Sequence, residues 1–399
     1  MPLGNGSNNQ FSKSCSNGGN TTMRQHYQFS APGRTEIGGN HTDHQQGCVL
    51  AAAVDLETVA DVIVNGTDWI NIHSDGYPLI RVNLNELHVH PEEQNTTAAL
   101  VRGVADGFVQ HGFELGGFDA KVHSSVLPGS GLSSSAAFEI LIATIMNDLF
   151  CNSRLPASEL AQIAKYAENK YFGKPCGLMD QLASATGGLV FMDFANPYEP
   201  KVEKINFDFA ATNHALCIID TGADHADLTE EYAAITKELL AVCQKFGKRY
   251  LREIPETEFM KALPEIRGKV PDRALLRAIH VYQENKRVVK EAEALKNGDF
   301  DAFLKLVIES GKSSWMYLQN IYPLGERSWQ DVAVTLALCE TLLEGRGAYR
   351  VHGGGFGGTV QAFVPNDMLD HFVQQIEKVT GKGSCHVMSI RKMGGIRLN

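Results

Sequence analysis

The sequence PGSGLSSSA, residues 128–136, joins a β-type run to an apolar helix pattern through residues that suit a phosphate group. Glycines let a backbone approach an anion closely, and serines open the helix where amide N–H groups point outward and the helix dipole is positive. No Gly-Lys-Ser/Thr follows the glycines, which excludes a Walker A loop. The stretch predicts a cradle for a nucleoside triphosphate, with an ordinary helix N-cap as the simpler alternative.

Two further motifs favour the phosphate cradle. APGRTEIGGNHTDH lies upstream at residues 31–44, and VHGGGFGGT lies downstream at residues 351–359. The second contains a Gly-x-Gly-x-x-Gly spacing, but a strand pattern follows it where a dinucleotide-binding fold needs a helix. Three such segments in this order resemble the GHMP small-molecule kinases and, within them, the galactokinases. The resemblance runs from about residue 29 to the C-terminus.

Composition sets bounds on the partners. The chain has 399 residues, of which 43% are hydrophobic and 21% charged, enough apolar material for two cores. A formal net charge of −10 argues against a polyanion-binding surface, so nucleic acid is not an expected partner. No window of the sequence approaches the ~18 apolar residues of a membrane span, so no membrane partner is expected.

The eight cysteines are spread along the chain without a Cys-x-x-Cys pair. They are typical of small core residues in a reducing compartment, and the expected location is the cytoplasm. Residues 1–25 are rich in Gly, Asn and Ser and lack the apolar core of a signal peptide, which predicts a mobile arm.

Hydrophobic periodicity predicts both helices and strands. Strands are expected over residues 47–54, 58–64, 117–126, 187–194, 214–220, 360–364 and 384–390. Besides the helix after residue 136, helices are expected over residues 95–112, 156–171, 224–246, 272–296, 300–315, 332–344 and 367–379. The polar stretch 195–204 is the candidate boundary between a domain at 26–204 and a second at 205–399.

The resemblance implies an α+β fold of two domains. The N-terminal domain would be ribosomal-protein-S5-like and the C-terminal domain ferredoxin-like with extra helices, with the active site between them.

Asp180 is the candidate catalytic residue. It lies in GLMDQ, residues 177–181, just after a glycine-containing turn, where a lone Asp is usually a cap. The segment resembles the Gly-x-Met-Asp-Gln motif of galactokinases, which implies that Asp180 accepts the proton of the sugar hydroxyl. The same resemblance pairs Arg34 with Asp180 and with the charge of the transferred phosphoryl group. A positive neighbour would also keep Asp180 ionised.

The resemblance also implies ATP and Mg²⁺. The nucleotide would be bound by the phosphate loop at Gly129, Ser130, Gly131, Leu132, Ser133, Ser134 and Ser135. Ser135 and Glu168 match the magnesium-associated positions, and Mg²⁺ prefers such hard oxygen ligands. Alternatively, Glu168 is a solvated helix residue.

The acceptor-binding motif departs from the family. Galactokinases usually carry Arg-x-Asn-x-x-Gly-Glu-His-Thr-Asp-Tyr. This chain has Glu36 in place of Asn, Gly38 in place of a bulky apolar residue, Asn40 in place of Glu and His44 in place of Tyr. The candidate acceptor residues are Asn40, His41, Thr42, Asp43, Gly177 and Tyr232. Zinc at His41 and His44 is not favoured, because no third ligand has a suitable spacing.

The activity implied by the resemblance is ATP-dependent phosphorylation of the anomeric hydroxyl of galactose, giving galactose 1-phosphate and ADP. A kinase for galacturonate, N-acetylgalactosamine or arabinose is the first alternative. A non-catalytic sensor of galactose and ATP is the second. The expected oligomeric state is a monomer or a weak oligomer.

Overall fold

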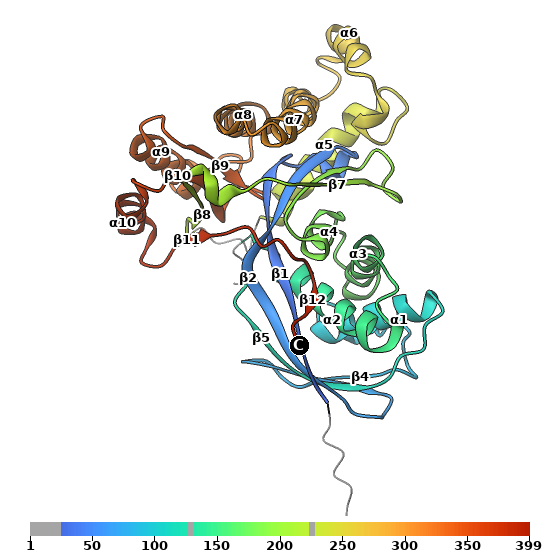
Figure 1. The fold of residues 1–399 in the computed structure, drawn as a ribbon. Coiled ribbons are helices and arrows are strands. Elements are labelled where there is room, and N and C mark those ends of the chain that lie inside the picture. The colour runs from blue at the N-terminus through green and yellow to red at the C-terminus, as the bar shows by residue number, and fades with distance from the viewer. Residues whose placement is uncertain (1–24, 127–130, 223–227) are drawn as a thin grey trace, which may run out of the picture.

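The chain forms two β-sheets flanked by helices (Figure 1), and the expected α+β class is confirmed. The structure is a computed structural model that describes residues 25–126, 131–222 and 228–399. The arm predicted at residues 1–25 lies almost entirely outside the described residues.

The first sheet has eight strands, with β12-β1-β2-β5-β3-β4 in order and β6 joining β2 to β7. Its strands are β1 (His26–Gly38), β2 (Cys48–Val64), β3 (Trp69–Ser74), β4 (Ile80–Asn83), β5 (Phe118–Ser124), β6 (Leu189–Asp193), β7 (Lys201–Ile205) and β12 (Ile396–Arg397). The predicted strands 47–54 and 58–64 are a single strand, β2, which pairs with β6 near its start and with β5 near its end. The prediction of two separate strands was wrong because β2 bends without ending.

Helices α1 (Thr97–Gln110), α2 (Ser134–Cys151), α3 (Ala157–Tyr166) and α4 (Met179–Thr186) lie together beside the first sheet (Figure 1). Over its 18 residues α2 has a mean hydropathy of 1.3, enough by length and composition to cross a membrane. The expectation that no window approaches this character was therefore wrong. In the folded chain 67% of that window is buried, as suits the central helix of a core.

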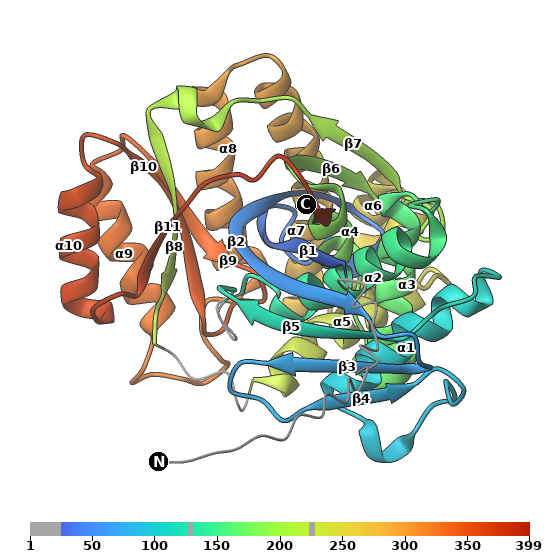
Figure 2. The same cartoon turned by 60° about the horizontal axis from the view of Figure 1, so that its bottom comes forward.

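The second sheet has the order β11-β8-β10-β9. Its strands are β8 (His214–Asp220), β9 (Ala348–His352), β10 (Thr359–Pro365) and β11 (Cys385–Met388). Side chains alternate along β10: Ala362 and Val364 pack on the side of α9 (Asp331–Leu343) and α10 (Leu369–Thr380), and Phe363 packs against α8 (Phe300–Ser313). Figure 2 shows α9 and α10 on the outer face of this sheet.

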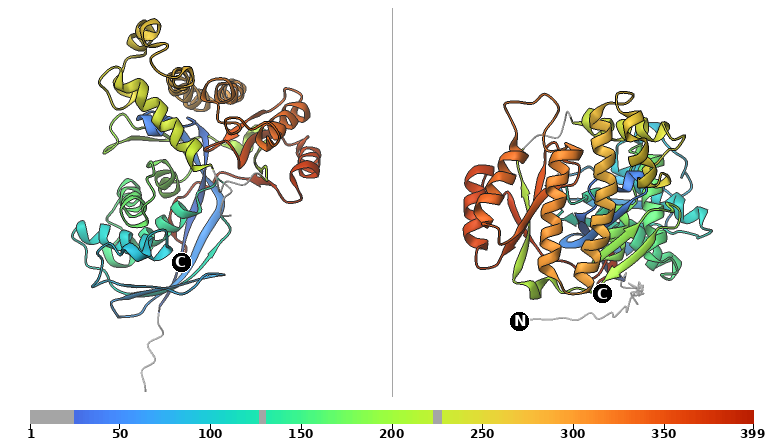
Figure 3. Two further views of the ribbon diagram at one scale, coloured as in Figure 1. Left: turned by 180° about the vertical axis from the view of Figure 1, so that it is seen from behind. Right: turned by 90° about the horizontal axis from the view of Figure 1, so that it is seen from above.

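Four helices complete the second half: α5 (Thr229–Gln244), α6 (Glu256–Ile266), α7 (Asp272–Lys296) and α8 (Phe300–Ser313). Helices α7 and α8 pack side by side (Figure 3) and share one core with strands of both sheets. That core joins Leu50 of β2, Val288 of α7 and Phe363 of β10. The sheets are thereby fixed against each other.

The domain boundary near residue 204 stays a prediction. Strand β7 ends at Ile205 and still belongs to the first sheet, and β12 returns from the C-terminal region to pair with β1 (Figure 1).

Candidate active site

The predicted pair of Arg34 and Asp180 is in direct contact. Arg34 Nε donates to Asp180 Oδ1 and Nη2 to Oδ2, each at 2.7 Å, which is a two-bond guanidinium–carboxylate contact. Arg34 follows a register shift between β1 and β2, and Asp180 lies in the first turn of α4. The side chain of Asp180 is 32% exposed, so the pair faces open space.

The surroundings of Asp180 favour its ionised form. Ser133 Oγ donates to Oδ2 at 2.8 Å. Burial alone would raise the pKa of Asp180, but the charge of Arg34 and hydrogen bonds from Arg34 and Ser133 outweigh it and lower the pKa below its ordinary value. Asp180 is therefore a carboxylate at neutral pH, as expected from a positive neighbour.

The described part of the phosphate loop lies against the same arginine. Arg34 donates from its backbone N–H to Leu132 O at 3.0 Å and from Nη1 to Gly131 O. Ser133 has a left-handed backbone (φ 56°) and precedes α2, which begins at Ser134. Of the predicted nucleotide-binding residues, Gly129 and Ser130 lie outside the described residues.

The phosphate loop also meets the third glycine motif. A Cβ on Gly131 would lie 2.9 Å from Thr359 Oγ1 and 3.1 Å from His352 Nδ1. Only glycine allows this approach, so the segments at residues 31–44, 131–136 and 352–359 converge on one place, as the resemblance implied.

Ser135 and Glu168 are neighbours in a group of side chains that carry oxygen atoms. Ser135 Oγ lies 3.5 Å from Glu168 Oε1, and Gln181 Nε2 donates to Glu168 Oε2 at 2.7 Å. Glu168 lies in the first part of the π-helical turn Ala167–Phe172 and is buried, which rules out the alternative of a solvated helix residue.

Glu139 is a site residue that sequence analysis missed. It lies one helical turn after Ser135, is fully buried, and accepts from Gln181 Nε2 at 3.2 Å, while its Oε1 has no partner among the described residues. Burial and the nearby Glu168 raise its pKa well above the ordinary value. The available signal was one charged residue inside the apolar run of residues 136–146.

The donor set at this place suits Mg²⁺. It consists of hydroxyl and carboxylate oxygens, and an orphaned buried carboxylate oxygen is what a bound cation would satisfy. Lys174 Nζ, 3.4 Å from Glu168 Oε1, supplies positive charge beside it. The described residues contain no cluster of three or more His, Cys, Asp or Glu with metal-binding geometry, so water and phosphate oxygens would have to complete the shell.

Two predicted acceptor residues meet on the third glycine motif. His41 Nε2 lies 2.9 Å from Gly354 O, and Tyr232 of α5 donates to Gly355 O at 3.0 Å. Burial lowers the pKa of His41 to about 4, so the imidazole is neutral at pH 7. A carbonyl accepts only, which makes Nε2 the protonated nitrogen and leaves Nδ1 to accept a hydroxyl.

Asp43 and Gly177 are also adjacent. A Cβ on Gly177 would lie 2.4 Å from Asp43 Oδ2, so the glycine is needed for the carboxylate to occupy its position. Thr42 has a different role, since its Oγ1 lies 2.8 Å from Gly39 O and 2.6 Å from Cys48 O and shares its single proton between these carbonyls within the buried turn. Thr42 shapes the loop that presents His41 and Asp43.

Asn40 is fully buried. Its Nδ2 donates to Gly353 O at 2.6 Å and to Glu36 Oε1 at 3.2 Å. Its Oδ1 accepts from Asn320 Nδ2 at 2.9 Å and from Ser314 Oγ at 3.2 Å. A sugar hydroxyl bound by this amide would have to displace one of these partners.

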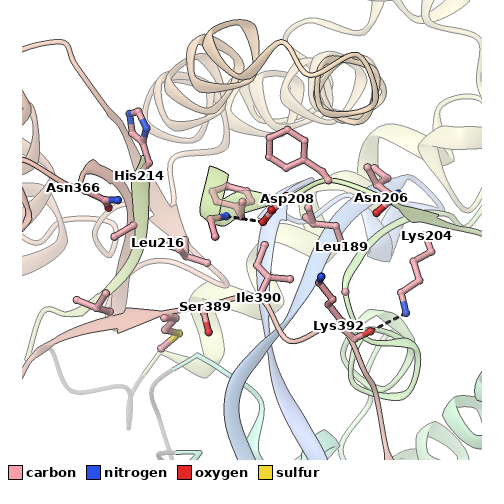
Figure 4. A pocket seen from close by; sticks show the side chains of 18 of the residues that line it. Leu189, Lys204, Asn206, Asp208, His214, Leu216, Asn366, Ser389, Ile390 and Lys392 are labelled. Carbon is pink, nitrogen blue, oxygen red and sulfur yellow. Dashed lines mark hydrogen bonds between the residues drawn. The ribbon is translucent and has the colours of Figure 1, made fainter. Parts of the chain in front are cut away.

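Two cavities of the described structure differ in their relation to the predicted site. One of about 580 Å³ is lined by His44, Lys165, Asn169, Cys176 and Arg249, among others. It is lined by none of the predicted acceptor residues, but His44 follows Asp43 and Cys176 precedes Gly177 in the sequence. A larger one, about 900 Å³, is lined by Leu189, Lys204, Asn206, His214 and Ile390, among others, and contains none of the predicted site residues (Figure 4).

Comparison with known proteins agrees with this geometry. Residues 99–188 match the family model of the GHMP kinase N-terminal domain, and residues 20–62 match the galactokinase galactose-binding signature. A galactokinase of Streptomyces coelicolor is 32% identical, over 88% of this chain and 87% of the relative. A galactokinase of Clostridium acetobutylicum is 30% identical, over 92% of this chain and 94% of the relative.

Solved structures give the same result for the fold. The galactokinase of Lactococcus lactis in complex with galactose superposes with a TM-score of 0.78 at 25% identity, covering 94% of this chain and 95% of that one. A mevalonate kinase shares the fold with a TM-score of 0.66 at 16% identity, covering 92% of this chain and 99% of that one. With relatives of this identity matched over nearly their whole length, and with the three motifs converging on one site, the chain belongs to the galactokinase family of GHMP kinases.

Proposed function

We propose that this protein transfers the γ-phosphoryl group of ATP to the anomeric hydroxyl of galactose, giving galactose 1-phosphate and ADP. The observation that carries the proposal is the two-bond contact of Arg34 with Asp180, which Ser133 joins just before the N-terminus of α2. A helix N-terminus attracts phosphate, and a carboxylate beside it can take a hydroxyl proton.

Asp180 and Arg34 have different roles in the proposed reaction. Asp180 orients the attacking hydroxyl and accepts its proton, and Arg34 holds the carboxylate while offering positive charge to the transferred group. A lowered pKa makes Asp180 a weak base. That suffices for a loose phosphoryl-transfer transition state, in which positioning and charge supply most of the catalysis.

The acceptor would lie between the third glycine motif and Asp43. Asp43 and His41 Nδ1 accept hydroxyls, and Tyr232 closes the opposite side through its contact with the glycine loop. Gly177 keeps space beside Asp43. For Mg²⁺, Ser135 and Glu168, with Glu139 behind them, are the residues that would hold the ion, which shields phosphate charge when bound.

A coupled ADP-release assay tests the proposal with galactose, galacturonate, N-acetylgalactosamine and arabinose. Galactose-dependent ADP release supports it. ATP and galactose binding without turnover would support the sensor instead, and turnover with another sugar alone would reassign the acceptor.

One observation favours galacturonate as a second candidate acceptor. The cavity beside His44 is bordered by Lys165 and Arg249, and the described chain gives neither cation a carboxylate partner within 4.0 Å. A carboxylate on the acceptor would find two unpaired positive charges there. If so, Lys165→Gln with Arg249→Gln lowers kcat/KM for galacturonate at least about tenfold and leaves the galactose value within about twofold. Equal losses for both sugars would contradict a carboxylate site.

We place the protein in the cytoplasm. The seven described cysteines are all free, and six of them are buried in the cores. Unpaired thiols are typical of a reducing compartment.

A further inference from the structure

Two departures from the family motif are in contact with each other. The motif has Asn at the position of Glu36 and Glu at the position of Asn40. In the structure, Asn40 Nδ2 donates to Glu36 Oε1 at 3.2 Å, and both residues are buried. The amide and the carboxylate of the motif are therefore both present here, at exchanged positions.

A fixed cation explains why the carboxylate can reside at residue 36. Arg350 of β9 is fully buried, donates to Ile37 O at 2.8 Å and to Val351 O at 3.0 Å, and forms an ion pair with Glu36 Oε1. A buried charge needs a partner, and removal of either member of such a pair leaves the other uncompensated. The same Glu36 oxygen joins Arg350 and Asn40.

The amide is equally suited to residue 40. It must donate to Gly353 O and accept from Asn320, and a carboxylate cannot do the first. The backbone of Asn40 is also held, because its carbonyl lies 3.0 Å from His280 Nε2 of α7. The loop Gly39–Asp43 is thus held in place by the contacts of Asn40 with Gly353, Asn320 and His280.

We propose that Glu36 and Asn40 are an exchanged pair of positioning residues, which hold the loop Gly39–Asp43 against the third glycine motif and leave the acceptor to His41 and Asp43. This rests on the proposed function. The exchange conserves the total charge and the total side-chain volume of the pair, which a closely packed interior requires.

The test is a double-mutant cycle that exchanges the charge without changing shape. It compares Glu36→Gln, Asn40→Asp and the double variant with the parent, by Tm, galactose KM, ATP KM and kcat. Each single change removes or duplicates the carboxylate beside Arg350. We expect a lower Tm and a galactose KM raised at least about tenfold, with ATP KM and kcat within about threefold of the parent. The double variant restores the total charge of the pair, but a carboxylate at residue 40 still cannot donate to Gly353 O, so its galactose KM should lie below that of the worse single variant without reaching the parental value.

The matched control is Glu265→Gln, at an exposed residue of α6, which should leave all four quantities unchanged. A double variant no better than its worse single variant overturns the proposal. So does an Asn40→Asp variant that changes galactose KM at unchanged Tm while Glu36→Gln has no effect, since Asn40 would then contact the acceptor directly.

A second double variant tests the exchange in the opposite direction and covers the case in which single variants do not fold. The double variant Glu36→Asn with Asn40→Glu rebuilds the family pattern and should also have a lower galactose KM and a higher Tm than its worse single variant. If the single variants do not fold, a cooperative melting transition in either double variant supports the proposal. The absence of such a transition in both double variants opposes it. If the parent does not phosphorylate galactose, the proposed function fails, whereas the Tm values still measure the coupling of the pair.

Discussion

Arg34 and Glu36 are two residues apart on β1, and each forms an ion pair, but the two pairs differ in exposure and in how far they follow the family. Arg34 and Asp180 face open space with 11% and 32% of their side chains exposed, whereas Arg350 and Glu36 are 0% and 6% exposed. Arg34 and Asp180 match the family motifs, whereas Glu36 departs from them. In the function that we propose, the first pair meets the reacting atoms, whereas the second lies behind the site and can exchange residues because its partners compensate.

Asp180→Asn breaks the first pair and should have the largest effect. The amide has nearly the same shape but cannot take a proton, and it loses the charge that holds Arg34. We expect kcat to fall at least about 1,000-fold with little change in Tm. Steady-state kinetics with a thermal melt checks this, and a folded variant with more than a tenth of parental turnover would refute the role of Asp180.

Ser135→Ala should have a smaller effect at the edge of the same site. Its hydroxyl lies 3.5 Å from Glu168, where we place Mg²⁺. The Mg²⁺ concentration for half-maximal rate should rise, and turnover should fall, each about tenfold, with galactose KM unchanged. The measurement is a magnesium titration at saturating ATP and galactose, with Ser158→Ala, at an exposed serine of α3, as the control. An unchanged titration removes Ser135 from the metal site.

Glu291→Gln tests the buried surroundings of the Arg350–Glu36 pair and should change the stability of the fold but not the activity. Glu291 is fully buried on α7, and neither carboxylate oxygen has a partner among the described residues. Burial and the charge of Glu284, against Arg350 and Arg287, raise its pKa from 4.5 to about 8. The protonated carboxyl is the form that folding favours. Its contribution to the free energy of unfolding is therefore full below pH 4.5 and is lost as the pH rises through about 8.

The glutamine variant should therefore be more stable than the parent by roughly 2–4 kcal/mol above pH 8, with the gap closing toward pH 5. Urea denaturation at several pH values measures this, and Glu265→Gln, on α6, serves as an exposed control. A gap that does not vary with pH would contradict an ionisation at this position. Turnover at pH 7 should be unaffected.

The position of Glu291 also accounts for Gly38, which replaces a bulky residue of the family motif. A Cβ at residue 38 would lie 1.9 Å from Glu291 Oε2. This is a second departure whose partner lies far away in the sequence, on α7.

Local signals predicted much of the fold. Strand β8 and helix α7 have the predicted bounds, because a short apolar run and a long periodic one each admit one interpretation. The same signals did not predict α6, whose last turn contains Pro264, or the π-helical turn that follows α3. Such features depend on packing against neighbours.

For the site, motifs located Arg34, Asp180 and the phosphate loop, since their residue types follow from the chemistry. They did not locate Glu139, Arg350 or Asn320, which act through burial and through contacts with residues remote in sequence. Sequence comparison showed Glu36 and Asn40 as two independent departures. Only the fold shows that they touch.

The pairing of β12 with β1 has a consequence for the order in which the chain is made. Phe29 and Ser30 of β1 pair with Arg397 and Ile396 of β12, which are synthesised more than 360 residues later. Until then one edge of β1 presents unpaired backbone groups, which can capture a strand of another nascent chain. During synthesis, this edge of the first sheet is therefore open to misassembly, although β1 is among the first strands to be made.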